Sequence, residues 1–150
     1  MNASYKKDNI CAVIVCYRVV INEFKDNIFR HLKNFSTVII VNNSPETSLN
    51  SFQSLQVTVI NNPSNIGLAA ALNIGILEAK KHGAEMVALF DQDTQLPFNF
   101  TQKMLKYINN YHSDKPVAIY SPIFHNHVIN QTGKHINFKP FRLIRLPVLN

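Results

Sequence analysis

Short apolar runs alternate with amphipathic segments along this chain of 150 residues. The runs have strand length, and the segments between them carry apolar residues at helical spacing. We expect strands over 10–17, 37–41, 57–60, 86–90 and 117–124, and helices over 22–33, 65–82 and 98–111. Continuous apolar strands separated by helices are typical of a mostly parallel sheet flanked by helices on both faces. The predicted fold class is therefore α/β.

The clearest helix signals lie between Asn65 and His82. Asn65 is a suitable N-cap, and a basic last turn precedes Gly83, as a helix C-terminus prefers. The inner face of this helix is expected to carry Ile66, Ala69, Ala70, Ile76 and Leu77. Asn73 lies within an otherwise small or apolar stripe, so we expect its side chain to need a polar partner.

Polar clusters follow four of the predicted strands. They are Tyr17-Arg18, Asn42-Asn43-Ser44, Asn61-Asn62 and Asp91-Gln92-Asp93. Parallel sheets bind ligands at the carboxyl ends of their strands. The sequence therefore predicts one polar rim with a binding site on it.

Asp91 and Asp93 are the strongest candidates for chemistry on this rim. In an extended segment, side chains two residues apart point to the same side. Two carboxylates on one side repel each other unless a cation lies between them, and Mg²⁺ typically binds one or two carboxylates together with substrate phosphates. The pair therefore indicates a site where a metal meets a phosphate. The alternative is a solvated Asp-rich turn, since Asp favours turns.

The composition suits a globular protein of one domain, with 46% hydrophobic and 16% charged residues. No apolar stretch approaches the ~20 residues that span a bilayer. The polar N-terminus followed by a short apolar run does not resemble a signal peptide. We therefore expect a cytoplasmic protein.

The formal charge of +6 is concentrated near the C-terminus. Five cations and no acidic residue occur from Lys115 onward, and Phe138, Phe141, Leu143, Ile144 and Leu146 are interleaved with them. Such a basic, irregular tail is compatible with peripheral contact to an anionic membrane, here at its inner face. The alternative is a solvated edge whose apolar residues pack inward. We do not expect nucleic-acid binding.

Several other chemistries are not indicated. Cys11 and Cys16 lie five residues apart on one predicted strand, hence on opposite faces, and we expect free buried thiols. The glycine-rich loops of dinucleotide-binding enzymes and P-loop NTPases are missing, as is the Gly-x-Ser-x-Gly of hydrolases. His125 and His127 are spaced as zinc ligands can be, but no cysteine or carboxylate lies near in sequence, so we interpret them as loop side chains.

Four blocks, in order and spacing, resemble the donor-binding half of an inverting GT-A glycosyltransferase of glycosyltransferase family 2. They are Val13–Arg18, Ile39–Ser44, Asn65-x-Gly-x-Ala-x-Ala-x-Asn73 and Phe90-Asp-Gln-Asp-Thr94, with 117–123 as a weaker fifth match. The Asp-Gln-Asp-Thr form is similar to the rhamnosyltransferase-like branch. The resemblance implies a GT-A-like (Rossmann-like) sheet in a single nucleotide-sugar-binding domain over 1–150. Its core would cover about 10–124, a basic tail 125–150, and the fold would be incomplete at the C-terminal side.

The resemblance also implies roles for individual residues. Those near the nucleotide sugar would be Tyr17, Asn42, Asn43, Asn65, Gly67, Asn73, Asp91 and Gln92. Asp93, with Asp91, would hold Mg²⁺ or Mn²⁺ between the two phosphates of the donor. The donor would be a dTDP- or UDP-linked sugar, with rhamnose as one candidate. The acceptor would be a saccharide or a lipid-linked sugar in polysaccharide biosynthesis.

The chain departs from the family pattern at three points. Asn42 stands where the family usually has Asp, and Arg18 stands where it usually has Asn. Inverting transfer also needs a general base, yet the last acidic residue is Asp114, in a predicted linker. The catalytic residue is therefore unknown. We expect a truncated chain that binds donor but transfers little sugar by itself, and whose uncovered apolar surface favours self-association.

Two other functions stay open. A nucleotidyltransferase-like enzyme would share the layout and the acidic metal site, but such enzymes usually carry a glycine-rich loop after the first strand, where this chain has Tyr17–Val20. A non-catalytic interaction or nucleotide-binding module is the second alternative, because no general base is evident.

Overall fold

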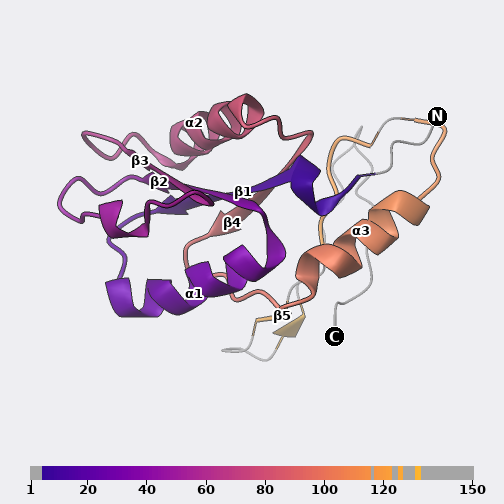
Figure 1. Cartoon of the computed structure of the whole chain (residues 1–150), viewed down its shortest axis with the longest axis horizontal. Coiled ribbons are helices and arrows are strands. Elements are labelled where there is room, and N and C mark those ends of the chain that lie inside the picture. Colours follow the sequence, from indigo (N-terminus) through magenta and orange to yellow (C-terminus); the bar gives the residue numbers. More distant parts are fainter. Residues whose placement is uncertain (1–4, 116, 123–124, 127–130, 133–150) are drawn as a thin grey trace. The chain divides into compact units, whose positions relative to one another are not determined.

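The structure is a computed structural model that describes residues 5–115, 117–122, 125–126 and 131–132. Residues 5–101 form one compact unit, and the described residues from 102 onward belong to a second (Figure 1). The strands are β1 (Ile10–Cys16), β2 (Thr37–Asn42), β3 (Val57–Asn61), β4 (Met86–Asp91), β5 (His125–Asn126) and β6 (Gln131–Thr132). The helices are α1 (Ile21–Asn34), α2 (Leu68–Lys81) and α3 (Phe100–Asn110), with 3-10 turns at Lys7–Asn9 and Asn50–Phe52.

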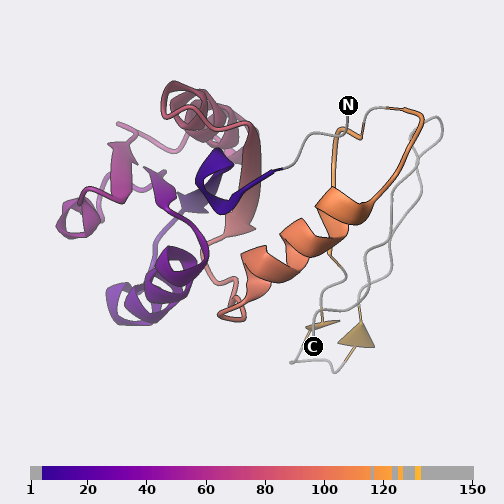
Figure 2. The same ribbon diagram turned by 45° about the vertical axis from the view of Figure 1, so that its right-hand side comes forward.

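A four-stranded parallel sheet with the order β3-β2-β1-β4 forms the centre of the first unit. Helix α2 covers one face of this sheet and α1 lies on the other, as two views of the chain show (Figures 1 and 2). Every residue of β1 is buried, and all but the first residue of β2 are buried. This arrangement confirms the predicted α/β class, and the first four strands lie within one residue of their predicted bounds.

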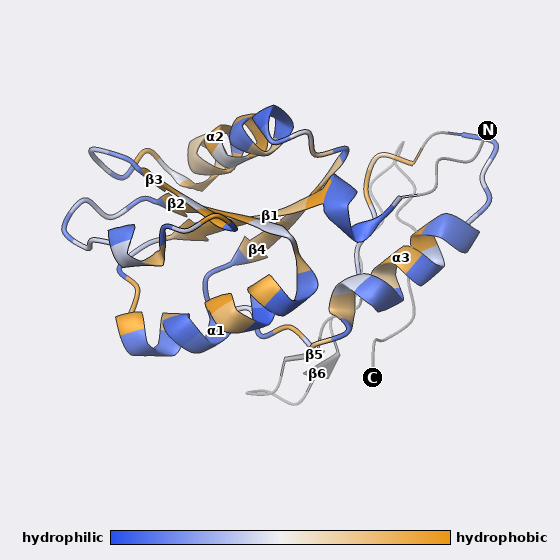
Figure 3. Cartoon of the chain, viewed as in Figure 1, coloured by the Kyte–Doolittle hydropathy of each residue, from blue (hydrophilic) through white to orange (hydrophobic). Residues whose placement is uncertain are grey.

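The apolar strands are buried between the two helices, while polar residues gather on the loops at the strand ends (Figure 3). Cys11 and Cys16 are both buried and free, as predicted. Cys11 belongs to the core cluster that includes Ala71 of α2, and strand alternation directs Cys16 to the opposite face. Burial raises the pKa of the Cys16 thiol to about 12, so this group stays a neutral thiol near neutral pH.

Helix α2 approaches the sheet through a stripe of small residues at every fourth position. Ala71, Gly75 and Ala79 are buried against β1 and β2. A methyl group at Gly75 would overlap Val13 Cγ1 and come within 3.1 Å of Val41 Cγ2. The predicted inner face is therefore wrong, since Ile66, Ala69, Ala70 and Leu77 are exposed and Ile76 is half-buried. Close approach of the helix to the sheet selects the smallest side chains rather than the largest.

Helix α1 buries one polar side chain in an aromatic cluster. His31 is fully buried, and its ring lies edge-on to Phe90 with 5.0 Å between centroids. Its Nδ1 lies 2.7 Å from the Asn27 carbonyl oxygen, so the geometry requires Nδ1 to carry the proton. Its Nε2 has no hydrogen-bond partner among the described residues. Burial lowers the pKa of His31, an effect that the bond to Asn27 opposes.

The two outer edges of the sheet differ. On β3, the Val59 N–H donates to Gln53 Oε1 (2.8 Å) and the Val57 N–H donates to Ser54 Oγ (3.2 Å), so the chain's own loop covers this edge. On β4, no strand pairs with the outer edge within residues 5–101, and Leu89 is 47% exposed.

The strand predicted over 117–124 is wrong over its described part. Residues 117–122 form no strand, only a single bridge residue at Ser121, and Pro122 lacks the N–H that a ladder requires. Instead β5 pairs with β6 in a short antiparallel ladder. Of the predicted basic tail over 125–150, the structure describes only residues 125–126 and 131–132. His125, interpreted from the sequence as a loop side chain, belongs to β5, and His127 lies outside the described residues. Among the described residues, no helix is both long and apolar enough to cross a membrane.

We predict that Gly75→Ala destabilises the protein by about 1–2 kcal/mol, because overpacking outweighs the gain of about 1 kcal/mol in helix propensity. Urea unfolding measures the change. In a Val13→Ala background, which removes the overlapping methyl group, the same substitution should be neutral or stabilising. Asn73→Ala, at an exposed position of the same helix, is the control and should stabilise slightly. Stabilisation by Gly75→Ala in the natural background would contradict the packing described.

We predict that buried His31 makes the fold sensitive to acid. Because its pKa is lowered in the folded state, the unfolded chain takes up the proton first as the pH falls below about 6.5. The free energy of unfolding should then fall by up to ~1.4 kcal/mol per pH unit relative to His31→Leu. Denaturant unfolding of both proteins between pH 8 and pH 5 compares the slopes. Parallel curves for the two proteins would show that His31 is not buried as a neutral ring.

Candidate functional site

The carboxyl ends of β1 to β4 lie at one edge of the sheet, as predicted. Beyond the last ladder pairs, the Asn43 N–H donates to the Cys16 carbonyl (2.8 Å) and the Asn62 N–H donates to the Asn42 carbonyl (2.9 Å). These bonds extend the register of the sheet into the loops. We call the resulting surface the strand-end rim; it comprises residues 17–18, 42–46, 61–67 and 91–94.

Asn42 is almost fully buried on this rim, and its amide is used within the protein. Its Nδ2 donates to the Thr47 carbonyl (2.6 Å) and to Asn61 Oδ1 (3.0 Å), while its Oδ1 accepts the Ser44 N–H (3.1 Å). These partners fix the orientation of the amide, since a carbonyl can only accept and an N–H can only donate. The side chain that the resemblance places near the nucleotide sugar therefore closes the loop that follows β2.

Asn43 joins the ends of β2 and β3 to the segment before α2. It is 3% exposed, its Nδ2 donates to Asn65 Oδ1 (2.7 Å), and its Oδ1 accepts from Asn62 Nδ2 and from the Ile66 N–H, both at 3.1 Å. Asn65 Oδ1 also accepts the Gly67 N–H (2.9 Å). The Asn65-x-Gly67 segment is therefore held against the rim by a buried asparagine.

The start of α2 differs from the prediction. Gly67, not Asn65, is the N-cap residue, and no side chain caps the helix. Gly67 has φ +85°, and a methyl group there would meet nothing within 4 Å, so backbone conformation rather than space favours glycine. Asn73 is exposed on α2, where water can satisfy its amide. The polar partner expected for Asn73 can therefore be solvent.

Asp91 and Asp93 flank a tight turn. Asp91 ends β4 opposite Val15 of β1, and the Thr94 N–H donates back to the Asp91 carbonyl (3.1 Å). Because the chain turns here, the strand alternation that would place both carboxylates on the same side ends at Asp91. Both residues are exposed. The described residues contain no group of three or more His, Cys, Asp or Glu side chains that could hold a metal, so a cation here would need further ligands from substrate or water.

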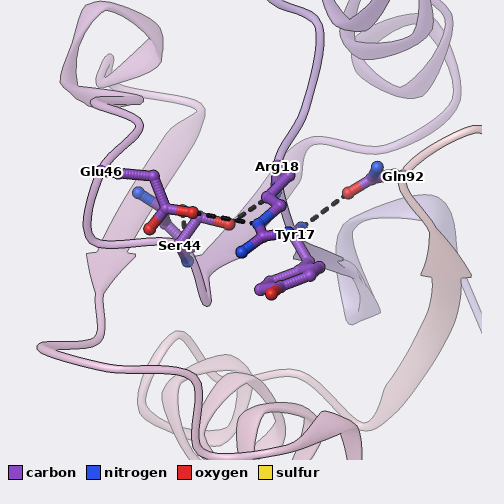
Figure 4. Close-up of polar contacts among 6 residues, drawn as sticks. Tyr17, Arg18, Ser44, Glu46 and Gln92 are labelled. Carbon is purple, nitrogen blue, oxygen red and sulfur yellow. Dashed lines mark hydrogen bonds and ion pairs between the residues drawn. The ribbon is translucent and has the colours of Figure 1, made fainter.

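Gln92 attaches this turn to two other elements. Its Oε1 accepts the Tyr17 N–H (2.7 Å), and its carbonyl accepts from Asn27 Nδ2 (3.1 Å) of α1. Figure 4 shows the Gln92 side chain reaching toward the backbone of Tyr17. Gln92, which the resemblance places near the nucleotide sugar, thus fixes the position of the turn that carries Asp91 and Asp93.

Tyr17 and Arg18 end β1 at the centre of the rim. The Arg18 N–H donates to Ser44 Oγ, and Ser44 is 1% exposed (Figure 4). The Arg18 guanidinium carbon lies 5.0 Å from the centroid of the Tyr17 ring, and its Nε lies 3.3 Å from Glu46 Oε1. Tyr17 is 41% exposed, which leaves much of the ring open to a ligand.

The sequence prediction missed two residues that shape the rim. Asn27 lies on the buried stripe of α1 between Phe24 and His31, and a polar residue in that stripe is a recognisable signal that something must accept its hydrogen bonds. Glu46 gives no such signal, because an exposed carboxylate in a loop is ordinary until the fold places a cation beside it.

Comparison with known proteins agrees with this geometry. Residues 11–149 match the family described as Glycosyl transferase family 2. The chain is also 31% identical, over 124 residues, to the dTDP-rhamnosyl transferase RfbF of Shigella flexneri. That alignment covers 77% of this chain and 38% of the relative, so the chain spans well under half of the relative's length.

We predict that replacing asparagine by aspartate lowers the unfolding free energy at Asn42 but hardly changes it at Asn65. Asn42→Asp replaces an amide that donates two hydrogen bonds by a carboxylate facing two oxygen acceptors, and should cost about 2–3 kcal/mol of unfolding free energy. Asn65→Asp keeps both hydrogen bonds that Asn65 Oδ1 accepts, and should change stability by less than about 0.5 kcal/mol. Thermal and urea unfolding at pH 7 measure both. An Asn42→Asp protein as stable as the natural chain would mean that the amide network is not formed.

Proposed function

The chain belongs to glycosyl transferase family 2, and we propose that it forms the donor-binding part of a glycosyltransferase that uses a nucleoside-diphosphate sugar. The observation that carries this proposal is the exposed Asp91–Asp93 turn at the carboxyl end of β4, attached through Gln92 to exposed Tyr17 at the end of β1. A nucleotide requires an apolar, flat surface for its base and a site for its charged phosphates. The rim offers both within one set of loops.

We propose that the donor is a dTDP-linked or UDP-linked sugar, and that rhamnose is the leading candidate for the sugar. The support for rhamnose is the name of the Shigella flexneri relative, a dTDP-rhamnosyl transferase. Transfer would proceed with inversion to a saccharide or lipid-linked acceptor. The alignment covers 38% of that relative, so these finer assignments are proposals that concern a whole glycosyltransferase.

The donor atoms at the turn suit a hard divalent cation. Asp91 and Asp93 are exposed carboxylates, and Mg²⁺ prefers one or two carboxylates together with phosphate oxygens and water. We propose that Asp93, with Asp91, holds Mg²⁺ or Mn²⁺. When bound there, such an ion would neutralise the negative charge of the departing nucleoside diphosphate.

The chain's own residues would then divide the work of binding. The exposed Tyr17 ring presents a flat surface to the base. The buried side chains of Asn42 and Asn43 keep the loops after β2 and β3 in place. Gln92 holds the turn after β4, so that Asp91 and Asp93 stay accessible. Sugar transfer also needs a group that removes the acceptor proton. We assign no residue of this chain to that role; Asp114, the last acidic residue, is exposed beyond α3.

The proposal is tested by calorimetric titration of the folded chain with UDP, dTDP and GDP and their sugars, in Mn²⁺ and in EDTA. We expect metal-dependent binding of one pyrimidine nucleotide. Asp93→Asn should weaken it at least tenfold, about 1.4 kcal/mol. Asp26→Asn, an equal change of charge at an exposed position of α1, is the matched control and should bind normally. Failure of every nucleotide to bind a chain that circular dichroism shows to be folded would refute the donor-site proposal.

A further inference from the structure

Arg18 has a backbone conformation that arginine rarely adopts. Its φ is +51°, and it is the one non-glycine residue with positive φ among the described residues. In this left-handed region the Cβ crowds the following carbonyl oxygen, so glycine, asparagine and aspartate are the usual occupants. A long, cationic side chain at such a position is not explained by local backbone preference.

The conformation is imposed by the ends of two neighbouring strands. The Tyr17 N–H is bound by Gln92 Oε1 from the turn after β4, and the next N–H, of Arg18, is bound by Ser44 Oγ from the loop after β2. Gln92 is in turn held by Asn27, and Ser44 by the Asn42 side chain. Because both acceptors are fixed, the chain must take this path at the end of β1, whatever residue stands at position 18. Strain of this kind concentrates at functional sites.

The contacts of the Arg18 side chain do not account for its presence either. The Arg18 side chain is 70% exposed and that of Glu46 is 53% exposed, and exposed ion pairs contribute little to stability. Among the described residues the guanidinium forms only the Nε–Glu46 hydrogen bond, although it carries five N–H donors. The guanidinium carbon lies over the Tyr17 ring, 5.0 Å from its centroid, so a ligand phosphate beside that ring can reach the remaining donors (Figure 4).

The charges of the strand-end rim point to the class of ligand. The rim segments 17–18, 42–46, 61–67 and 91–94 contain three carboxylates, Glu46, Asp91 and Asp93, and a single cation, Arg18. A nucleoside diphosphate that approached three carboxylates would be repelled unless positive charge met it. Asp91 and Asp93 can obtain that charge from a metal, whereas Glu46 already has it from Arg18.

We propose that Arg18 is a donor-recognition residue whose guanidinium leaves Glu46 and binds a phosphate oxygen of the nucleoside diphosphate. This inference rests on the proposed function, because the nucleotide is the same one. Arg18 binds phosphate well because its planar group can offer two parallel N–H donors to one phosphate. Glu46 then acts as a competitor that holds the guanidinium over Tyr17 while no donor is bound.

The test combines affinity with stability for three variants of the full chain. Arg18→Asn should raise the melting temperature by a few degrees, since asparagine tolerates positive φ, and should weaken dTDP or UDP binding about tenfold or more. Arg18→Lys should retain part of the affinity, because it keeps the charge but loses the planar pair of donors. Glu46→Gln should tighten binding several-fold, since the competing carboxylate is gone. A stabilised protein that binds worse cannot be explained by a merely structural role for Arg18.

Comparison of ligands identifies the group that Arg18 contacts. We expect Arg18→Asn to leave the weak binding of thymidine or uridine unchanged and to reduce the binding of the corresponding diphosphate. An equal loss for nucleoside and diphosphate would overturn the inference, because the contact would then be to the base. Diphosphate binding that is unaffected by Arg18→Asn would also overturn it, while leaving the proposed function standing. No diphosphate binding by the natural folded chain would overturn both.

Discussion

The whole rim depends on one constraint: backbone N–H and C=O groups beyond the last ladder pairs of a parallel sheet still need hydrogen-bond partners. In this protein side-chain amides supply several of these partners. Asparagine suits the task because its amide both donates and accepts, so a single side chain can join two loops. Asn42 and Asn43 do so at the end of β2. Gln92 joins the turn after β4 to the end of β1 by accepting the Tyr17 N–H at its Oε1. The loops are thereby fixed before any ligand arrives, which lowers the entropy lost on binding.

This constraint separates the residues of the rim into two groups. Asn42, Asn43 and Ser44 are buried and occupied by internal bonds, so their role is to shape the loops. Tyr17, Arg18, Asp91 and Asp93 are exposed and directed by that framework. The same division accounts for Asn42 where the family usually has Asp, since an aspartate could not donate to the Thr47 carbonyl. The framework also connects the Asp91–Asp93 turn to the end of β1, because Gln92 Oε1 accepts the backbone N–H of Tyr17.

The sheet could be predicted from the sequence because fully buried parallel strands are continuous apolar runs, as in β1 and β2. The position of the carboxylate pair and of Tyr17 at strand ends could be predicted, because the end of an apolar run is visible in the sequence. The inner face of α2 could not be predicted in this way. Hydrophobicity favours Leu77 as an inward residue, whereas the close approach of the helix to Val13 selects Gly75. The internal bonds of Asn42 and Gln92 and the positive φ of Arg18 were also beyond reach, because each depends on loops that are distant in sequence and adjacent only after folding. The resemblance to a family places residues at a site, but it does not say which of them face the ligand.

The central claim is that a ligand binds the exposed groups of the strand-end rim. Asn42 and Asn43 do not contact it, because their side chains are already hydrogen-bonded within the protein. Heteronuclear NMR of the labelled chain, titrated with dTDP or UDP and Mg²⁺, tests it most directly. The account predicts the largest shifts at the backbone amides of residues 17–18, 67 and 91–94, with the buried side-chain amides of Asn42 and Asn43 nearly unmoved. Shifts that centre instead on the outer face of α2, around Leu77 and Lys81, or large changes at the two asparagine side chains, would contradict it.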